Sequence, residues 1–305
     1  MLEIYFKTDR DTTMRRVDQF RPGAWVYAKE ATLEDLEKII AITGLDLAEI
    51  RDSLDKYEMP RVERTDNSLI FFVRHPDEQE IGSYTMTLTL ILQDQVAIAI
   101  SPHRSELIEQ FIPQNIPFDG HQKTKLILQI LLKITQDYTN GIKKVRHCMM
   151  EPKQEQDIES KAILALMQNE EVLNQYLTSL VPMRNLLETM AAGRYVHLQE
   201  QDMDLVDDLM IALKQSEDVC RVNIKSIRSL RDSYQIIFTN SVNRTIKLLT
   251  ALTVIVTIPT IIASIYGMNV PLPFQSNPYA FILILCFTVF GTATAILLFL
   301  RKRWL

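Results

Sequence analysis

Residues 248–269, LLTALTVIVTIPTIIASIYGMN, contain no Asp, Glu, Lys or Arg. The run from Leu248 to Tyr266 is about as long as the apolar helix that crosses a bilayer. A second such run occupies 279–300, and the uncharged stretch 248–300 covers 53 positions. The whole chain of 305 residues is 47% hydrophobic and 23% charged, which is ordinary for a soluble protein, so the average conceals two unlike parts. We therefore expect two membrane-spanning helices.

Charged residues flank the two spans in a consistent order. Arg244 and Lys247 precede the first span, the basic cluster 301–303 follows the second, and the loop between them is uncharged. Since basic residues stay on the cytoplasmic side, we expect a multi-pass protein of the cell membrane with both termini in the cytoplasm and the loop outside. Residues 1–247 carry a net charge of −8, which argues against nucleic-acid binding and suits a cationic partner.

Polar side chains recur along the first span at steps of three and four residues: Thr250, Thr253, Thr257, Thr260 and Ser264. Such steps place them on one helical face, which we call the hydroxyl stripe. Two interpretations stay open. The hydroxyls bond to carbonyls four residues earlier and let helices pack closely, or the face lines a wet pore in a symmetric oligomer. In the second case the hydroxyls and the amide of Asn243 offer neutral oxygens to a hydrated cation.

The segment Tyr266-Gly267-Met268-Asn269 lies where the hydroxyl stripe reaches the outer end of the span. With the short loop, the second span and the basic terminus RKRWL, it closely resembles the CorA family of magnesium transporters, whose hallmark is the Gly-Met-Asn motif. Residues 44–63, GLDLAEIRDSLDKYEMPRVE, resemble the cytoplasmic helix-turn segment of that family. The long helical region before the first span resembles its stalk, so the resemblance covers the whole chain.

The resemblance implies an α+β membrane protein that assembles as a funnel-shaped homopentamer. We divide the chain accordingly into a cytoplasmic α/β domain at 1–120, a long-helix bundle and stalk at 121–247, a pore-lining helix at 248–266, an extracellular loop with the motif at 267–278, a second span at 279–300 and a basic cytoplasmic tail at 301–305.

In the family-like pore, Tyr266, Gly267, Met268 and Asn269 form the selectivity filter, and Asn269 binds the entering ion. Mg²⁺ gives up its water reluctantly, so amide and carbonyl oxygens can accept hydrogen bonds from its intact hydration shell. The implied lining continues inward through Ser264, Thr260, Thr257, Thr253, Thr250, Leu249, Ile246 and Asn243. Leu249 and Ile246 fall at the family's hydrophobic constriction. Thr253 and Thr257 are more polar than the narrow stretch of that family.

The resemblance also implies regulation by cytoplasmic Mg²⁺ bound between neighbouring subunits. Alignment on the two quoted segments brings Asp52 and Asp208 onto the family's sensor acids, one from each of two subunits. Asp55, Asp204 and Asp207 are further candidates. Paired carboxylates repel when empty and bind when a cation bridges them, which couples occupancy to packing. The alternative is that the acids form a solvated helix face. Mg²⁺ is thus expected both as the transported ion and as the regulator.

The first part of the chain, to about residue 115, has the pattern of a mixed α/β unit. Thr32 and Asp35 predict a helix start and Gly44 its end. A second helix is expected at 45–56, and alternating apolar residues predict strands at 69–73, 84–92 and 96–100.

Long helices are predicted from about Lys123 onward, with breaks at Pro152, Pro182 and Gly193. The 65 residues between Gly193 and Pro259 contain neither glycine nor proline. One unbroken helix of that length would extend roughly 100 Å, which predicts a rod that leaves the cytoplasmic domain and enters the bilayer.

No enzyme is expected, because the five histidines are isolated and no phosphate loop or hydrolase spacing is visible. The resemblance implies Mg²⁺ uptake, with Co²⁺ and Ni²⁺ as further ions. One alternative is a zinc-transporting relative; that branch usually has Val where Met268 stands, so this residue favours magnesium. The other is a membrane-anchored scaffold or sensor that does not conduct, for which a polar face in the membrane would have no use.

Overall fold

The computed structural model describes residues 1–7, 14–80, 83–94, 96–111, 123–150, 158–194, 200–270, 272–273 and 277–304. The chain forms two compact units, Met1–Ser229 and Leu230–Leu305. Helix α6 (Glu200–Tyr266) contributes residues to both units. The helix break predicted at Pro152 lies outside the described residues.

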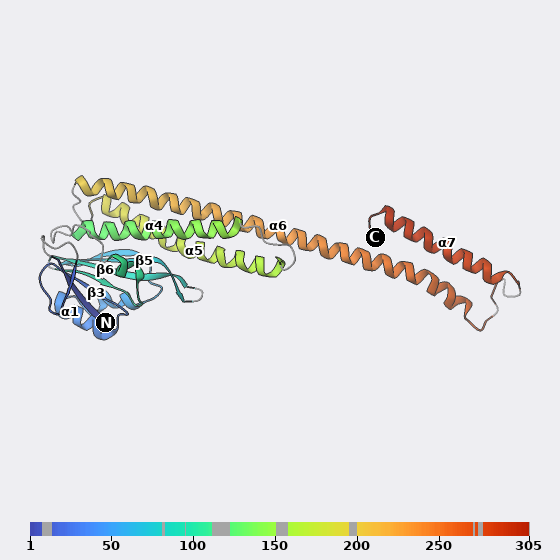
Figure 1. Ribbon diagram of the computed structural model, residues 1–305, viewed down its shortest axis with the longest axis horizontal. Helices are drawn as coiled ribbons and strands as arrows, with labels where there is room; N and C mark the ends of the chain where they lie inside the picture. Colours follow the sequence, from blue (N-terminus) through green and yellow to red (C-terminus); the bar gives the residue numbers. More distant parts are fainter. Residues whose placement is uncertain are drawn as a thin grey trace. The chain divides into compact units, whose positions relative to one another are not determined.

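A seven-stranded mixed sheet forms the centre of the first unit (Figure 1). Its strands are β1 (Leu2–Phe6), β2 (Arg15–Val17), β3 (Ala24–Ala28), β4 (Arg61–Arg64), β5 (Ser68–Glu80), β6 (Ser83–Gln93) and β7 (Val96–Ile100), in the order β2-β1-β3-β7-β6-β5-β4. Strands β3 and β7 pair in parallel, and the other neighbours pair antiparallel. The sequence predicted β5, β6 and β7 but did not single out β1 to β4.

One face of the sheet packs against α1 (Leu33–Thr43) and α2 (Leu47–Ile50). Helix α1 is as predicted: Thr32 and Asp35 form a reciprocal capping box, and the left-handed Gly44, with φ of 74°, ends the helix. The second helix is shorter than predicted. After Ile50, which is fully buried, the chain tightens into the 3₁₀ turn η1 (Arg51–Leu54).

Helices α4 (Lys123–Met150) and α5 (Ile158–Ala191) cover the opposite face, and the first part of α6 lies along them (Figure 1). The short helix α3 (Glu106–Phe111) follows β7. The buried Tyr138 of α4 joins its layer to the sheet, because its hydroxyl donates to the carbonyl of Arg74 at 3.1 Å.

The helix break predicted at Pro182 is wrong, because Pro182 lies inside α5. An internal proline removes one helical hydrogen bond and costs about 3 kcal/mol. The flanking residues Leu180, Met183 and Leu187 are almost completely buried against the rest of the unit, and this packing keeps the helix continuous. The predicted break at Gly193 is observed just beyond the end of α5, where φ is 71°.

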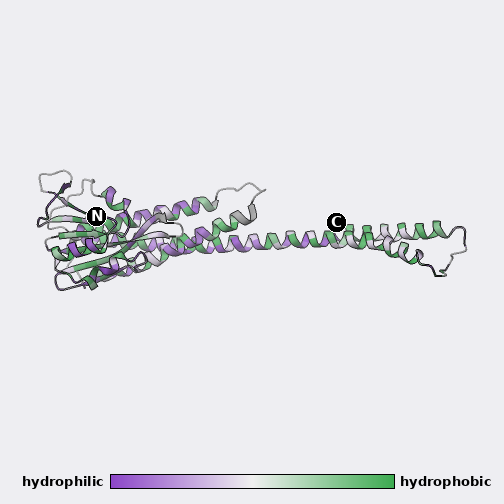
Figure 2. Ribbon diagram, turned by 90° about the horizontal axis from the view of Figure 1, so that it is seen from below, coloured by the Kyte–Doolittle hydropathy of each residue, from purple (hydrophilic) through white to green (hydrophobic). Residues whose placement is uncertain are grey.

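The second unit contains the last part of α6 and the helix α7 (Ala280–Arg301). Both are apolar (Figure 2), and both are long and apolar enough to cross a membrane. Helix α6 stays continuous through Pro259. The predicted architecture of an N-terminal α/β domain, a long helix and a second apolar C-terminal helix is therefore confirmed.

Candidate functional site

The hydroxyl stripe keeps a regular set of contacts on α6. Four of its hydroxyls donate to the carbonyl four residues earlier: Thr250 to Ile246, Thr253 to Leu249 and Thr260 to Val256 at 2.8 Å each, and Thr257 to Thr253 at 2.6 Å. The local part of the packing interpretation is thus observed. Because each hydroxyl proton is directed to a carbonyl, the oxygen keeps its lone pairs as acceptors. Water molecules in the hydration shell of a cation point their protons outward. A row of hydroxyl oxygens can accept hydrogen bonds from those protons.

Helix α7 covers the side of α6 opposite the hydroxyl stripe. Ala251 is fully buried and Ile255, Ile258 and Ile262 are partly buried, whereas every member of the stripe is exposed. A Cβ atom placed on Gly291 of α7 would lie 3.8 Å from the Ile258 side chain, which shows how closely the helices approach. The two faces of α6 therefore differ in partner: α7 packs on one, and the polar face stays available to other molecules.

The continuation of this face toward the amino end of α6 carries the predicted constriction. Asn243, Ile246 and Leu249 are all exposed, and Leu249 accepts the hydrogen bond from Thr253 through its carbonyl. The exposed isoleucine and leucine form an apolar step between the amide below and the hydroxyls above. Apolar side chains can close a channel by excluding water where several helices surround a pore.

The predicted filter begins where α6 ends. Tyr266 is the last helical residue, and the next two amides still bond to the helix, from Gly267 to Ala263 at 2.9 Å and from Met268 to Ile265 at 3.3 Å. A Cβ atom on Gly267 would lie only 3.2 Å from the carbonyl oxygen of Ala263. Glycine thus permits the close turn, after which Met268 and Asn269 are exposed. Part of the loop that follows lies outside the described residues.

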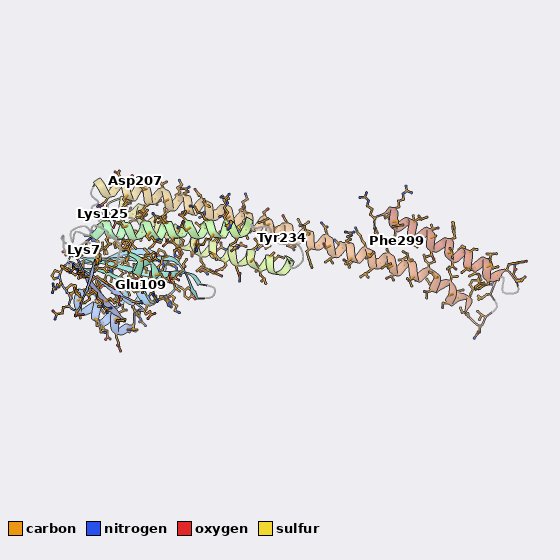
Figure 3. All side chains as sticks on the ribbon, in the orientation of Figure 1. Lys7, Glu109, Lys125, Asp207, Tyr234 and Phe299 are labelled. Carbon is orange, nitrogen blue, oxygen red and sulfur yellow. The ribbon has the colours of Figure 1, made fainter. Side chains whose placement is uncertain are left out.

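The predicted sensor acids lie in different layers of the first unit. Asp52 belongs to η1, on the face that α1 covers, and Asp208 belongs to α6, on the other face. Figure 3 labels Asp207, the residue before Asp208, near the amino end of α6. Both predicted acids are exposed, as are the further candidates Asp55, Asp204 and Asp207. A single chain does not bring Asp52 and Asp208 together, and among the described residues no group of three or more His, Cys, Asp or Glu side chains could hold a metal ion.

Asp52 has a partner that the sequence analysis missed. Arg61 Nη2 donates to Asp52 Oδ2 at 2.8 Å, Arg61 Nε donates to Glu63 Oε1 at 2.6 Å, and Arg61 Nη1 donates to Glu58. The guanidinium stacks 4.0 Å from the ring centroid of Phe72. Partial burial lowers the pKa of Arg61, but the three carboxylates raise it above its ordinary value overall. The alternation of Arg61 and Glu63 on one strand face could have indicated this cluster.

A second arginine, Arg74, fixes the loop beneath this cluster. Its buried side chain donates through Nη1 to the carbonyls of Lys56 at 2.7 Å and Glu58 at 3.3 Å, and through Nε to the hydroxyl of Thr85 at 3.0 Å. These oxygens take the place of a carboxylate partner, which a buried charge otherwise needs. The backbone around Glu58 is therefore held in place, and with it the acid that meets Arg61.

Comparison with known proteins identifies the family. The family model described as CorA-like Mg2+ transporter protein matches residues 23–303. The chain belongs to this family. The resemblance inferred from the sequence is thereby confirmed, and the chain is placed in a family of transporters rather than of enzymes.

Two CorA relatives match this chain in sequence, one over 92% of its length and one over 34%. The cobalt/magnesium transport protein CorA of Methanocaldococcus jannaschii is 22% identical over 290 residues, covering 92% of this chain and 91% of the relative. The magnesium transport protein CorA of Wolinella succinogenes is 35% identical over 109 residues, covering 34% of each chain. The solved complete structure of the M. jannaschii CorA magnesium transporter matches with a TM-score of 0.80 at 20% identity, over 100% of this chain and 99% of that one. This likeness shows that the CorA fold extends over the whole chain.

The CorA assignment also bears on the membrane. CorA proteins are membrane-bound transporters, and the two apolar helices of this chain fit the expected spans.

Proposed function

We propose that the protein conducts Mg²⁺ across the cell membrane, with Co²⁺ and Ni²⁺ as further ions. The observation that carries this proposal is that α7 packs on the face of α6 opposite the hydroxyl stripe and leaves the stripe exposed, together with neighbouring apolar side chains such as Leu252 and Val256. The protons of these hydroxyls are bonded within the helix, but their acceptor lone pairs would stay unsatisfied in lipid, which costs free energy. The cost disappears if copies of α6 surround a common axis and direct their stripes into water.

The assembly we propose is a homopentamer, as the family resemblance implies. Five stripes then form five rings of acceptor oxygens along the pore, and the filter residues Tyr266, Gly267, Met268 and Asn269 stand at its outer end. The carboxamide of Asn269 can accept hydrogen bonds from the hydration shell of Mg²⁺ without replacing it. Selection then follows from the size of the hydrated ion and from outer-sphere hydrogen bonds.

The orientation and regulation we propose follow from charge. The basic residues Arg244, Lys247 and 301–303 favour cytoplasmic termini. An inward membrane potential then favours entry of a divalent cation by about 4.6 kcal/mol per 100 mV, twice the single-charge value. Such a pore needs a mechanism that closes it when the cytoplasmic Mg²⁺ concentration is high. We propose that cytoplasmic Mg²⁺ binds between Asp52 of one subunit and Asp208 of the next, and that the intersubunit arrangement is required because one chain holds these acids on opposite faces of its sheet.

The identity of the ion is supported by Met268 and by the names of the relatives, which are magnesium and cobalt/magnesium transport proteins. The zinc-transporting alternative has less support. A non-conducting scaffold would leave the uncovered stripe without a purpose.

Ion flux into liposomes tests the proposal. The wild-type protein should admit Mg²⁺ and Co²⁺ more rapidly than Zn²⁺, and Asn269→Ala should abolish Mg²⁺ flux while the oligomer, measured by size-exclusion chromatography with light scattering, stays intact. Unchanged flux in the variant would exclude Asn269 from the filter. A wild type that admits only Zn²⁺ would favour the zinc alternative, and one that admits no ion would favour the scaffold.

A further inference from the structure

Arg61 is already bound to the acid that the proposed regulatory ion must reach. Its guanidinium contacts one oxygen of Asp52 at 2.8 Å, and it also contacts Glu58 and Glu63. A guanidinium and a divalent cation both seek carboxylate oxygens, and both carry positive charge. The contact uses one of the two oxygens of Asp52, so a guanidinium and an ion can oppose each other there through their like charges and through the orientation of the carboxylate.

We propose that Arg61 is an internal competitor of Mg²⁺ at Asp52. It thereby sets the cytoplasmic Mg²⁺ concentration at which the regulatory ion binds and the pore closes. This inference rests on the proposed regulatory role of Asp52. It adds a residue that determines affinity without being a ligand of the ion.

The exchange is inexpensive because of where the charges lie. The Asp52 side chain is 52% exposed, and the Arg61 side chain is 32% exposed, so the contact between them is at the edge of the solvent. Exposed ion pairs contribute little net free energy, and this one opens readily. When Asp52 turns to an ion, Arg61 keeps Glu58 and Glu63, and its stack on Phe72 remains. No buried charge is left without a partner.

Arg61 could instead strengthen Mg²⁺ binding, because a contact that fixes Asp52 in one orientation can preorganise the carboxylate for an ion. The two possibilities differ in sign. If Arg61 competes, its removal tightens Mg²⁺ binding. If Arg61 preorganises the acid, its removal weakens binding.

The experiment titrates Mg²⁺ against full-length protein in detergent and measures protection from chymotrypsin. Chymotrypsin is chosen because loss of Arg61 removes a trypsin site. The variants are Arg61→Gln, Asp52→Asn and Arg64→Gln. Arg64 is the matched control: it is exposed, lies three residues further along β4 on the opposite strand face, and its loss removes the same charge. Thermal unfolding of each variant verifies that it is folded, and Arg61→Lys serves if Arg61→Gln does not fold.

Arg61→Gln should lower the half-protecting Mg²⁺ concentration by about three- to fivefold, the range expected for a weak exposed pair. Arg64→Gln should shift it by less than twofold. Arg61→Lys, which keeps the charge but loses the planar fork, should also lower it, though less than Arg61→Gln. If Asp52→Asn loses protection while neither Arg61 variant lowers the midpoint beyond the Arg64 control, the competition is refuted and the sensor stands. If Asp52→Asn keeps wild-type protection, the proposed sensor fails, and the role of Arg61 fails with it.

Discussion

The hydroxyl of Thr257 donates a 2.6 Å hydrogen bond to the carbonyl of Thr253, one turn earlier on the exposed face of α6. The bond directs the hydroxyl proton toward the helix and leaves the oxygen as an acceptor. Two neighbouring rings of the proposed pore are thus linked through the backbone, and neither carries a charge that could trap a divalent ion.

Replacement of this hydroxyl should slow conduction. Thr257→Val keeps the shape of the side chain but presents a methyl group to hydrated Mg²⁺, so we expect Mg²⁺ flux into liposomes to fall about tenfold, the equivalent of about 1.4 kcal/mol. Thr257→Ser should keep most of the flux because it retains the oxygen.

The matched control for this change lies on α7. Thr294 makes the same type of bond, from its hydroxyl to the carbonyl of Phe290 at 2.8 Å, and is also exposed. Thr294→Val should leave flux near the wild-type value. Equal losses in the two valine variants would mean that the hydroxyls matter only for packing and would remove the argument for a water-facing stripe.

Removal of the second sensor acid should weaken the response to cytoplasmic Mg²⁺. Asp208→Ala should raise the Mg²⁺ concentration needed to protect the full-length protein from proteolysis by about tenfold or more, because one carboxylate of the proposed intersubunit pair is missing. Asp218→Ala is the control, since Asp218 is an exposed acid further along α6. If both variants respond alike, the acids act only as a solvated helix face.

Acid should destabilise the first unit through His75. This residue is 1% exposed, its Nε2 lies 3.2 Å from Ser105 Oγ, and burial lowers its pKa from 6.5 to about 4. The unfolded chain binds the proton first as pH falls, so stability is lost between about pH 6.5 and 4, and the neutral form contributes fully above that range.

The contribution of His75 can be measured as the difference between the pH profiles of the wild type and of a variant that lacks this histidine. Between pH 7.5 and 5 the histidine should account for about 2 kcal/mol of the lost unfolding free energy, measured by urea denaturation followed by tryptophan fluorescence. His75→Gln should lack this part and show a flatter pH profile. Identical profiles for the two proteins would show that His75 does not stay neutral in the fold.

Gly141 is required by the packing of α4 against α5. A Cβ atom at this position would lie 2.6 Å from Tyr176 Oη and 2.8 Å from its Cε2 atom, and Tyr176 is held edge-on against Tyr138 with ring centroids 5.0 Å apart. Gly141→Ala should therefore lower the unfolding free energy by about 1–3 kcal/mol in the same urea assay. In a Tyr176→Leu background the alanine should cost almost nothing, and a similar cost in both backgrounds would count against the steric cause.

Local periodicity in the sequence was enough to predict several features of this protein. The uncharged runs from Leu248 onward predicted two apolar helices, and the spacing of Thr250 to Ser264 placed the hydroxyls on one face, because both properties depend only on helical geometry. Thr32 and Gly44 predicted the ends of α1, because capping is a contact within one turn. Comparison with the CorA family then confirmed the interpretation that the motif at Gly267 to Asn269 suggested.

Contacts between distant segments required the tertiary structure. Packing overrides the break predicted at Pro182, and Arg61 joins acids from a 3₁₀ turn, a loop and a strand. The face of α6 that α7 covers, and the separation of Asp52 from Asp208 by the sheet, likewise follow from how elements pack. A side chain's own sequence neighbourhood determines the helix or strand it enters, but its partners depend on which surfaces the rest of the chain buries.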